Sequence, residues 1–128
     1  ILFNAAVSHE IGELNLYESE HLGGSNVFGI TGIEGYSVRT YTLNYLFDSG
    51  LIDRIDFLKI DIEGSEWEVL DSTSNHIFEM TDKFLLEYHW PNGRLWSVLD
   101  RMHSLGFKHW FEPGCTEDDH NGTVLFYR

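Results

Sequence analysis

The sequence has little cysteine, proline or positive charge: it contains 1 cysteine, 2 prolines and 8 basic residues against 21 acidic ones. The single thiol, Cys115, excludes an internal disulfide and leaves the redox compartment open. The formal net charge of −13 argues against nucleic acid or an anionic membrane as the main partner, because both bind basic surfaces. A cationic or neutral small-molecule substrate, or a metal, is compatible with that charge. No apolar run approaches the roughly 20 residues of a membrane span, so we expect no membrane partner and a cytoplasmic location.

Length and composition indicate a single globular domain. A chain of 128 residues is one domain at most, and we expect that domain to span residues 1–128. A chain of this size buries about two thirds of its unfolded surface, which is enough for a core. Apolar residues make up 42% of the chain and aromatic residues 15%, a composition typical of globular rather than disordered proteins.

The most informative segment is a short apolar run that ends in carboxylates. Residues 57–62 have the length and apolar content of a buried strand, and Asp61, Glu63 and Glu66 lie at its end or shortly after it. In open α/β sheets, ligands bind just outside the carboxyl ends of the strands. The three acids therefore predict a functional site at that edge of a sheet.

A helix is expected directly after these acids. Gly64 allows a tight turn, and the spacing of Ser65 and Glu68 predicts a capping box that starts a helix over residues 65–71. The plainer alternative is that the preceding acids only cap this helix and interact with its positive end.

A second apolar strand, expected over residues 84–88, carries Glu87 and is followed by His89. If this strand is parallel to the first, His89 faces the same edge as Asp61 and is the best general-base candidate by position and residue type. The alternative is an ordinary edge histidine bonded to a backbone carbonyl. Glu87 is equally well explained as a structural partner of Lys59 or Arg94.

Four segments of the sequence, the acidic motif included, have recognisable patterns. Residues 59–66 read Lys-Ile-Asp-Ile-Glu-Gly-Ser-Glu, residues 42–44 read Thr-Leu-Asn, residues 4–8 precede a Gly-Glu-Leu at 12–14, and residues 85–89 read Leu-Leu-Glu-Tyr-His. Together they resemble the FkbM family of S-adenosylmethionine-dependent methyltransferases. The resemblance covers nearly the whole chain, and the block at 59–66 is its most specific part.

Two departures from the family pattern stand out. Asn44 replaces the usual aspartate, which is expected to alter substrate or metal contacts. The glycine-rich cofactor loop, G-x-G-x-x-G, is absent from the sequence, which begins at Ile1 inside a strand-like run. We therefore expect a fragment of a longer protein, or a sheet whose missing strands come from another chain, for example in a homo-oligomer, because unpaired buried backbone groups are costly.

The resemblance implies an α/β fold: a partial Rossmann-like methyltransferase sheet, mostly parallel, with an antiparallel closing strand pair. Residues 18–37 are glycine-rich and are expected to form a long loop, either a connector or a lid. Residues 72–82 show no clear pattern. Periodicity places the other elements as strands at 1–7, 13–17, 57–62, 84–88, 107–111 and 123–127, and as helices near 43–47, 65–71 and 95–102.

The resemblance also implies the cofactor, S-adenosylmethionine, and some of its contacts. It places Asp61 close to the transferred methyl group, as a catalytic and cofactor-binding residue. In this fold class the end of the first visible strand, with Asn4 and Ala5, flanks the adenine. Small side chains there let a ring pack, although they are equally explained by tight packing.

The activity that the resemblance implies is methyl transfer to a hydroxyl of a small molecule or sugar, which requires removal of a proton. His89 or a carboxylate such as Glu63 can take it. A divalent metal can instead lower the pKa of the hydroxyl, with Glu63, Glu66 and Glu87 as substrate or metal ligands.

Other functions are compatible with the same residues. The chain could be a non-catalytic methyltransferase remnant or an interaction module, and a weaker alternative is a metal-dependent hydrolase that uses Asp61, Glu63 and His89. Zinc is disfavoured, because the spacing of the soft ligands in the last part of the chain matches no standard pattern; these ligands are His109, Cys115 and His120.

Overall fold

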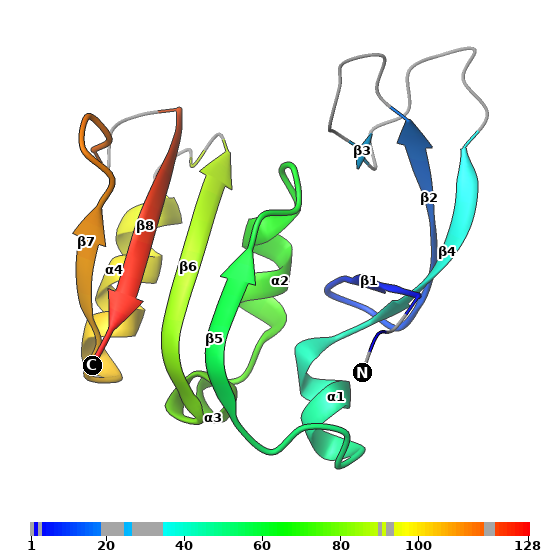
Figure 1. Ribbon diagram of the computed structural model, residues 1–128, viewed down its shortest axis with the longest axis horizontal. Coiled ribbons are helices and arrows are strands. Elements are labelled where there is room, and N and C mark those ends of the chain that lie inside the picture. The colour runs from blue at the N-terminus through cyan, green and yellow to red at the C-terminus, as the bar shows by residue number, and fades with distance from the viewer. Residues whose placement is uncertain are drawn as a thin grey trace.

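The computed structural model describes residue 2 and residues 4–18, 25–26, 35–89, 91, 94–116 and 120–128. Within these residues the chain forms two separate four-stranded sheets (Figure 1). The first sheet has the order β1-β4-β2-β3 and the second the order β5-β6-β8-β7. The strands of the first sheet are β1 (Ala6–Val7), β2 (Gly12–Glu18), β3 (Ser25–Asn26) and β4 (Tyr36–Tyr41). Those of the second are β5 (Ile55–Ile60), β6 (Thr81–His89), β7 (Lys108–Phe111) and β8 (Asn121–Tyr127).

The first sheet is built around β4. This strand pairs in parallel with β1 and antiparallel with β2, which pairs antiparallel with β3. The strand expected over 13–17 is confirmed by β2, whereas of the strand expected over 1–7 the described residues 2 and 4–7 contain only the two residues of β1. The predicted loop at 18–37 contains β3 and the start of β4, and its segments 19–24 and 27–34 lie outside the described residues.

The second sheet holds the apolar core of the protein. Along β6 every second side chain from Phe84 to Tyr88 is buried, as expected for a strand with one covered face. The helix α4 (Arg94–Ser104) presents the buried stripe Leu95, Val98, Leu99 and Met102, which confirms the predicted helix. It lies with α2 (Glu66–Ser72) against one face of this sheet (Figure 1).

Two short helices complete the described structure. The helix α1 (Leu43–Asp48) follows β4 and ends before Gly50, whose φ of 71° explains the predicted stop. The helix α3 (Asn75–Glu79) lies in the segment 72–82, for which the sequence showed no pattern. No helix of the described residues is long and apolar enough to cross a membrane.

The expected mostly parallel sheet is wrong, although the α/β class is right. Among the described strands only the β1–β4 and β5–β6 pairs are parallel. Strand β8 lies antiparallel between β6 and β7, which confirms the closing pair. The expected single sheet is also divided into two. In the described part of the chain, β1 is an edge strand of the first sheet and β5 an edge strand of the second, and no strand pairs with both. Only six residues separate β2 from β3 in the sequence, too few for the crossover that a parallel pair needs, and these strands pair antiparallel.

Candidate active site

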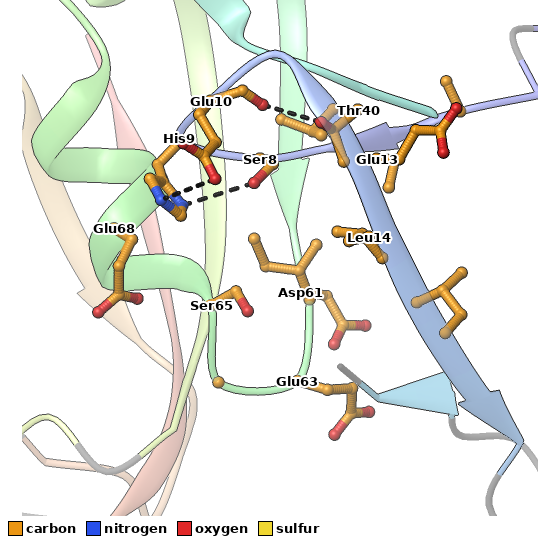
Figure 2. Close-up of a pocket in the computed structure, with 16 residues that line it drawn as sticks. Ser8, His9, Glu10, Glu13, Leu14, Thr40, Asp61, Glu63, Ser65 and Glu68 are labelled. Carbon is orange, nitrogen blue, oxygen red and sulfur yellow. Dashed lines mark hydrogen bonds and ion pairs between the residues drawn. The ribbon is translucent and has the colours of Figure 1, made fainter. Parts of the chain in front are cut away.

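A cavity of about 670 Å³ lies between the two sheets, at the carboxyl end of β5 (Figure 2). One wall is the segment from Asp61 to Ser65 with Glu68 of α2, and the other is formed by residues 5–10 together with side chains of β2 and Thr40. The lining contains five carboxylates and no lysine or arginine among the described residues; these acids are Glu10, Glu13, Asp61, Glu63 and Glu68. The cavity is therefore suited to a ligand that carries positive charge or hydroxyl donors.

The wall formed by residues 61–65 is a tight turn that joins β5 to α2. Glu63 and Gly64 have φ angles of 54° and 103°, so the chain reverses through two left-handed residues. The carboxylate of Glu66 reaches back over the turn and accepts the N–H groups of Ile62 at 3.2 Å and of Gly64 at 2.9 Å. The predicted glycine turn and its position at the strand end are thus confirmed.

The predicted capping box is wrong. Ser65 is the N-cap residue of α2, but its side chain makes no capping hydrogen bond. Glu68 contacts Arg94 at 3.2 Å instead. The N–H of Ser65, which Glu68 would accept in a capping box, donates instead to the carbonyl of Ile62 at 3.5 Å. Glu66 accepts the N–H groups of Ile62 and Gly64, which precede the helix.

His89, the last residue of β6, lies at the same edge as the acids after β5. Its Nδ1 is 3.1 Å from Oε1 of Glu66 and its Nε2 is 3.9 Å from Oε2 of Glu63. The side chain is 12% exposed, whereas that of Glu66 has no exposed surface. The Trp67 indole N–H donates to the carbonyl of His89 at 2.8 Å, which fixes the end of β6 against α2.

Asp61 follows β5 directly and lies beside two other charged groups. The ammonium group of Lys59 donates to its Oδ2 at 2.6 Å, and this contact raises the pKa of Lys59. Burial, followed by the negative charge of Asp61, raises the pKa of Glu87, while His89 and Lys59 partly offset the increase. Of the two structural partners suggested for Glu87, Lys59 donates to Asp61 but also acts on Glu87 through its charge, whereas Arg94 donates to Glu68.

The structure brings only some of the predicted site residues to the cavity. Asp61, Glu63 and Ala5 line it, while Asn4 is exposed and is not among the lining residues. Glu66 and His89 are not among the lining residues: His89 lies 3.9 Å from Glu63, and Glu66 contacts His89.

Asn44 has a structural part in the fold. Its side-chain amide donates to the carbonyl of Ser72 at 2.7 Å and its oxygen accepts the N–H of Ser74 at 3.0 Å. An aspartate could make only the second of these bonds, because a carboxylate has no hydrogen to donate. The replacement of the usual aspartate thus serves the junction of α1 with α2 and α3 rather than the cavity.

Apart from Ala5, which the family resemblance placed beside the cofactor, the opposite wall was not foreseen from the sequence. Ser8, His9 and Glu10 belong to the turn between β1 and β2, and Figure 2 shows His9 directed toward Glu10 and Ser8. Thr40 donates to the carbonyl of Glu10 at 2.9 Å and holds this turn. A short polar turn between two strands carries no pattern that distinguishes it from an ordinary surface turn.

The arrangement of donors does not fit a preformed metal site. Among the described residues, no group of three or more histidine, cysteine, aspartate and glutamate side chains is placed to hold a metal ion. Asp61 is bonded to Lys59, and the oxygens of Glu66 accept backbone N–H groups. Near the C-terminus His109 contacts His103 at 2.7 Å.

Acids and a histidine lie at the carboxyl ends of two parallel strands of this α/β protein, the edge at which open α/β sheets bind ligands, and Asp61 and Glu63 line a cavity there. A comparison with family models identifies it more closely, since the model described as "Methyltransferase FkbM domain" matches residues 3–109. The chain therefore belongs to the FkbM methyltransferase domain family, which confirms the resemblance found in the sequence. Neither a curated protein nor a solved structure matches the chain.

Proposed function

We propose that this protein is an S-adenosylmethionine-dependent methyltransferase that acts on a hydroxyl group of a small molecule. Membership of the methyltransferase family gives the reaction class. The observation that supports the finer assignment is the cavity at the carboxyl end of β5, which Asp61 and Glu63 both line. A cytoplasmic location and a homo-oligomeric state stay predictions.

The residues around the cavity fit this cofactor in two ways. Ala5 and Ala6 line one wall, and their small side chains leave room for a flat ring. The opposite wall offers Asp61 and Glu63, whose carboxylates suit a cationic group and hydroxyl donors. When bound, the cofactor supplies an electrophilic methyl group.

The protein's own residues would then bind the acceptor and take its proton. Glu63 is the carboxylate best placed to accept a hydrogen bond from an acceptor hydroxyl, because it lines the cavity with 48% of its side chain exposed. His89 lies directly behind it, with Nε2 3.9 Å from Glu63 Oε2. We assign His89 as the general base that takes the proton by way of Glu63, since a neutral imidazole can take a proton near pH 7.

A divalent metal has no part in this proposal. The carboxylate of Asp61 accepts a hydrogen bond from Lys59, and that of Glu66 is bonded to the N–H of Gly64 and to His89. The described donor set therefore fits proton removal by a side chain better than activation by a metal ion.

Calorimetric titration with S-adenosylhomocysteine tests the proposal. We expect saturable binding to the 128-residue chain, and a loss of at least about tenfold in affinity for Asp61→Asn, which corresponds to roughly 1.4 kcal/mol. Asp56→Asn is the matched control, because Asp56 is an exposed aspartate of β5 that does not line the cavity.

Two outcomes would contradict the assignment. Absence of binding would favour a non-catalytic methyltransferase-like module. Equal affinities of the Asp61→Asn and Asp56→Asn variants would show that the ligand does not use the carboxyl end of β5.

A further inference from the structure

We infer that Glu66 is a positioning residue that holds the proton of neutral His89 on Nδ1 and keeps Nε2, on the side of Glu63, as the proton acceptor. The role of His89 as a base rests on the proposed function. The assignment of the ring proton to Nδ1 does not rest on it. Glu66 would thus act through His89 and through the turn, without contacting substrate or cofactor.

The first step is the state of the Glu66 carboxylate. Its side chain has no exposed surface, and both oxygens accept the N–H of Gly64, while Oε1 also accepts the N–H of Ile62. Backbone N–H groups can only donate, so an ionised carboxylate satisfies every one of these contacts. A buried charge of this kind is retained only where it is fully hydrogen-bonded.

The second step is the tautomer of His89. Nδ1 lies 3.1 Å from the same Oε1 that accepts the two backbone N–H groups. Because an ionised carboxylate has no hydrogen to give, the hydrogen in this contact belongs to Nδ1. In neutral His89 the lone pair is then on Nε2, the nitrogen 3.9 Å from Glu63.

The third step is that one side chain fixes both parts of the site. Glu66 sets the turn that carries Glu63 into the cavity, and it sets the ring of His89 behind that turn. Its neighbour Trp67 bonds to the carbonyl of His89, so the first turn of α2 holds ring and backbone together. A carboxylate that orients a histidine and offsets its charge after proton transfer is an effective arrangement for a base.

The test is ¹⁵N nuclear magnetic resonance of the His89 ring in the wild-type protein. We expect the Nδ1–H tautomer, although histidine in water prefers Nε2–H. In Glu66→Met, which removes the acceptor but keeps an apolar buried side chain, we expect loss of the Nδ1–H signal and a majority of Nε2–H.

Two variants serve as controls. In Glu66→Gln the converging N–H groups of Ile62 and Gly64 place the amide oxygen at the Oε1 position, so Nδ1–H is expected to persist. Glu79→Met removes an exposed carboxylate 3.9 Å from Nδ1 of His76 and is expected to leave the His89 spectrum unchanged.

An Nε2–H tautomer in the wild type, or an unchanged tautomer in Glu66→Met, would overturn the inference. If Glu66→Met does not fold, the wild-type spectrum alone decides. A side chain that only capped the turn would not control the tautomer. Titration of the wild type with S-adenosylhomocysteine separates the two proposals, because absence of binding contradicts the proposed function and leaves the tautomer result standing.

Discussion

Glu63 has an unfavourable backbone conformation at the place where its side chain is used. Among the described residues, Glu63 is the only non-glycine residue with a positive φ, which is 54°, and its side chain lines the cavity. The left-handed region costs a residue with a Cβ roughly 1–2 kcal/mol. Such strain persists where the surrounding structure imposes it, and here the hydrogen bonds from Gly64 and Ile62 to Glu66 do so.

A comparison of Glu63→Gly with Glu63→Ala measures this strain. Both variants lose the carboxylate, but only glycine adopts a positive φ without penalty. We therefore expect the glycine variant to be more stable than the alanine variant by about 1 kcal/mol in urea unfolding. In most positions alanine is the more stable of the two, so a glycine variant of equal or lower stability would contradict this expectation.

Glu87 makes the stability of the protein depend on pH. Burial and Asp61 raise its pKa above the usual value of 4.5, so the folded protein binds this proton more tightly than the unfolded chain. The resulting stabilisation is fully present below about pH 4.5 and is lost as the pH rises through the higher pKa of the folded state.

Glu87→Gln removes this dependence. At pH 7 the variant is expected to be more stable than the wild type, by less than about 1 kcal/mol, the range of exposed charge interactions. The difference is expected to shrink toward pH 4. Urea midpoints measured between pH 4 and pH 8 check the trend, with Glu112→Gln as an exposed control. A difference that grows on acidification would have the wrong sign.

At the scale of elements, Arg101 connects α4 to the ends of α2 and α3. Its guanidinium donates to the carbonyl of Leu70 at 2.7 Å, to the carbonyl of Thr73, and to the side chain of Asn75 at 2.7 Å. It also lies over the ring of Phe78, 4.9 Å from its centroid. These contacts satisfy carbonyls that the end of α2 leaves open.

Arg101→Lys keeps the charge but removes the planar group that reaches three acceptors at once. We expect a loss of about 2 kcal/mol in the free energy of unfolding, the scale of one or two charged hydrogen bonds. Arg54→Lys is the control, because Arg54 is exposed and its contacts with Asp56 and Asp82 belong to the weak surface class. Equal losses in denaturant unfolding would contradict the structural role of Arg101.

The elements that the sequence predicted are those with a strong repeat. The stripe of α4 and the apolar run of β6 are local patterns that burial enforces, whereas β5 buries only Ile60 and leaves Phe57 exposed. The five-residue α3 is too short to show a repeat. The formation of β4 depends on pairing with β1 and β2, which lie far from it in the sequence. The order and direction of strands depend on such pairing, which explains the wrong expectation of a mostly parallel sheet.

The candidate site was predictable mainly on one side. In the sequence Asp61 and Glu63 come at the end of one apolar run and His89 after the next, so their common edge could be expected. On the opposite wall, Ala5 was expected from the family resemblance. The wall formed by His9 and Glu10 depends on how the first sheet meets the second. The burial of Glu66 likewise depends on the turn closing over it, and the spacing of charges does not contain that information.

For the whole molecule, the two sheets contribute unequally to the core. Every residue of the buried apolar cluster lies at or after Leu43, in α1, the second sheet and the helices that cover it or in adjoining segments. The first sheet contributes none of them among the described residues, and its buried residue Thr40 is polar. Regions with few buried apolar contacts open at lower free energy than the rest of a protein.

Hydrogen exchange monitored by mass spectrometry tests this difference. We expect amides of β2 and β4 to exchange faster than those of β6 and β8, because only the latter belong to the apolar core. S-adenosylhomocysteine is expected to slow exchange in the first sheet, since that sheet forms one wall of the cavity. Uniform protection of both sheets without ligand would show that they unfold as one unit.

The origin of the two cavity walls has a consequence for how substrate choice can change. The proposed reacting groups come from the ends of β5 and β6, while the facing wall comes from the turn after β1 and from β2. Substitutions at Ser8, His9 or Glu10 alter what the cavity admits without touching the apolar core or the Glu66–His89 contact. Diversification of acceptors, in evolution or in a designed library, can therefore proceed on one wall while the chemistry on the other is conserved.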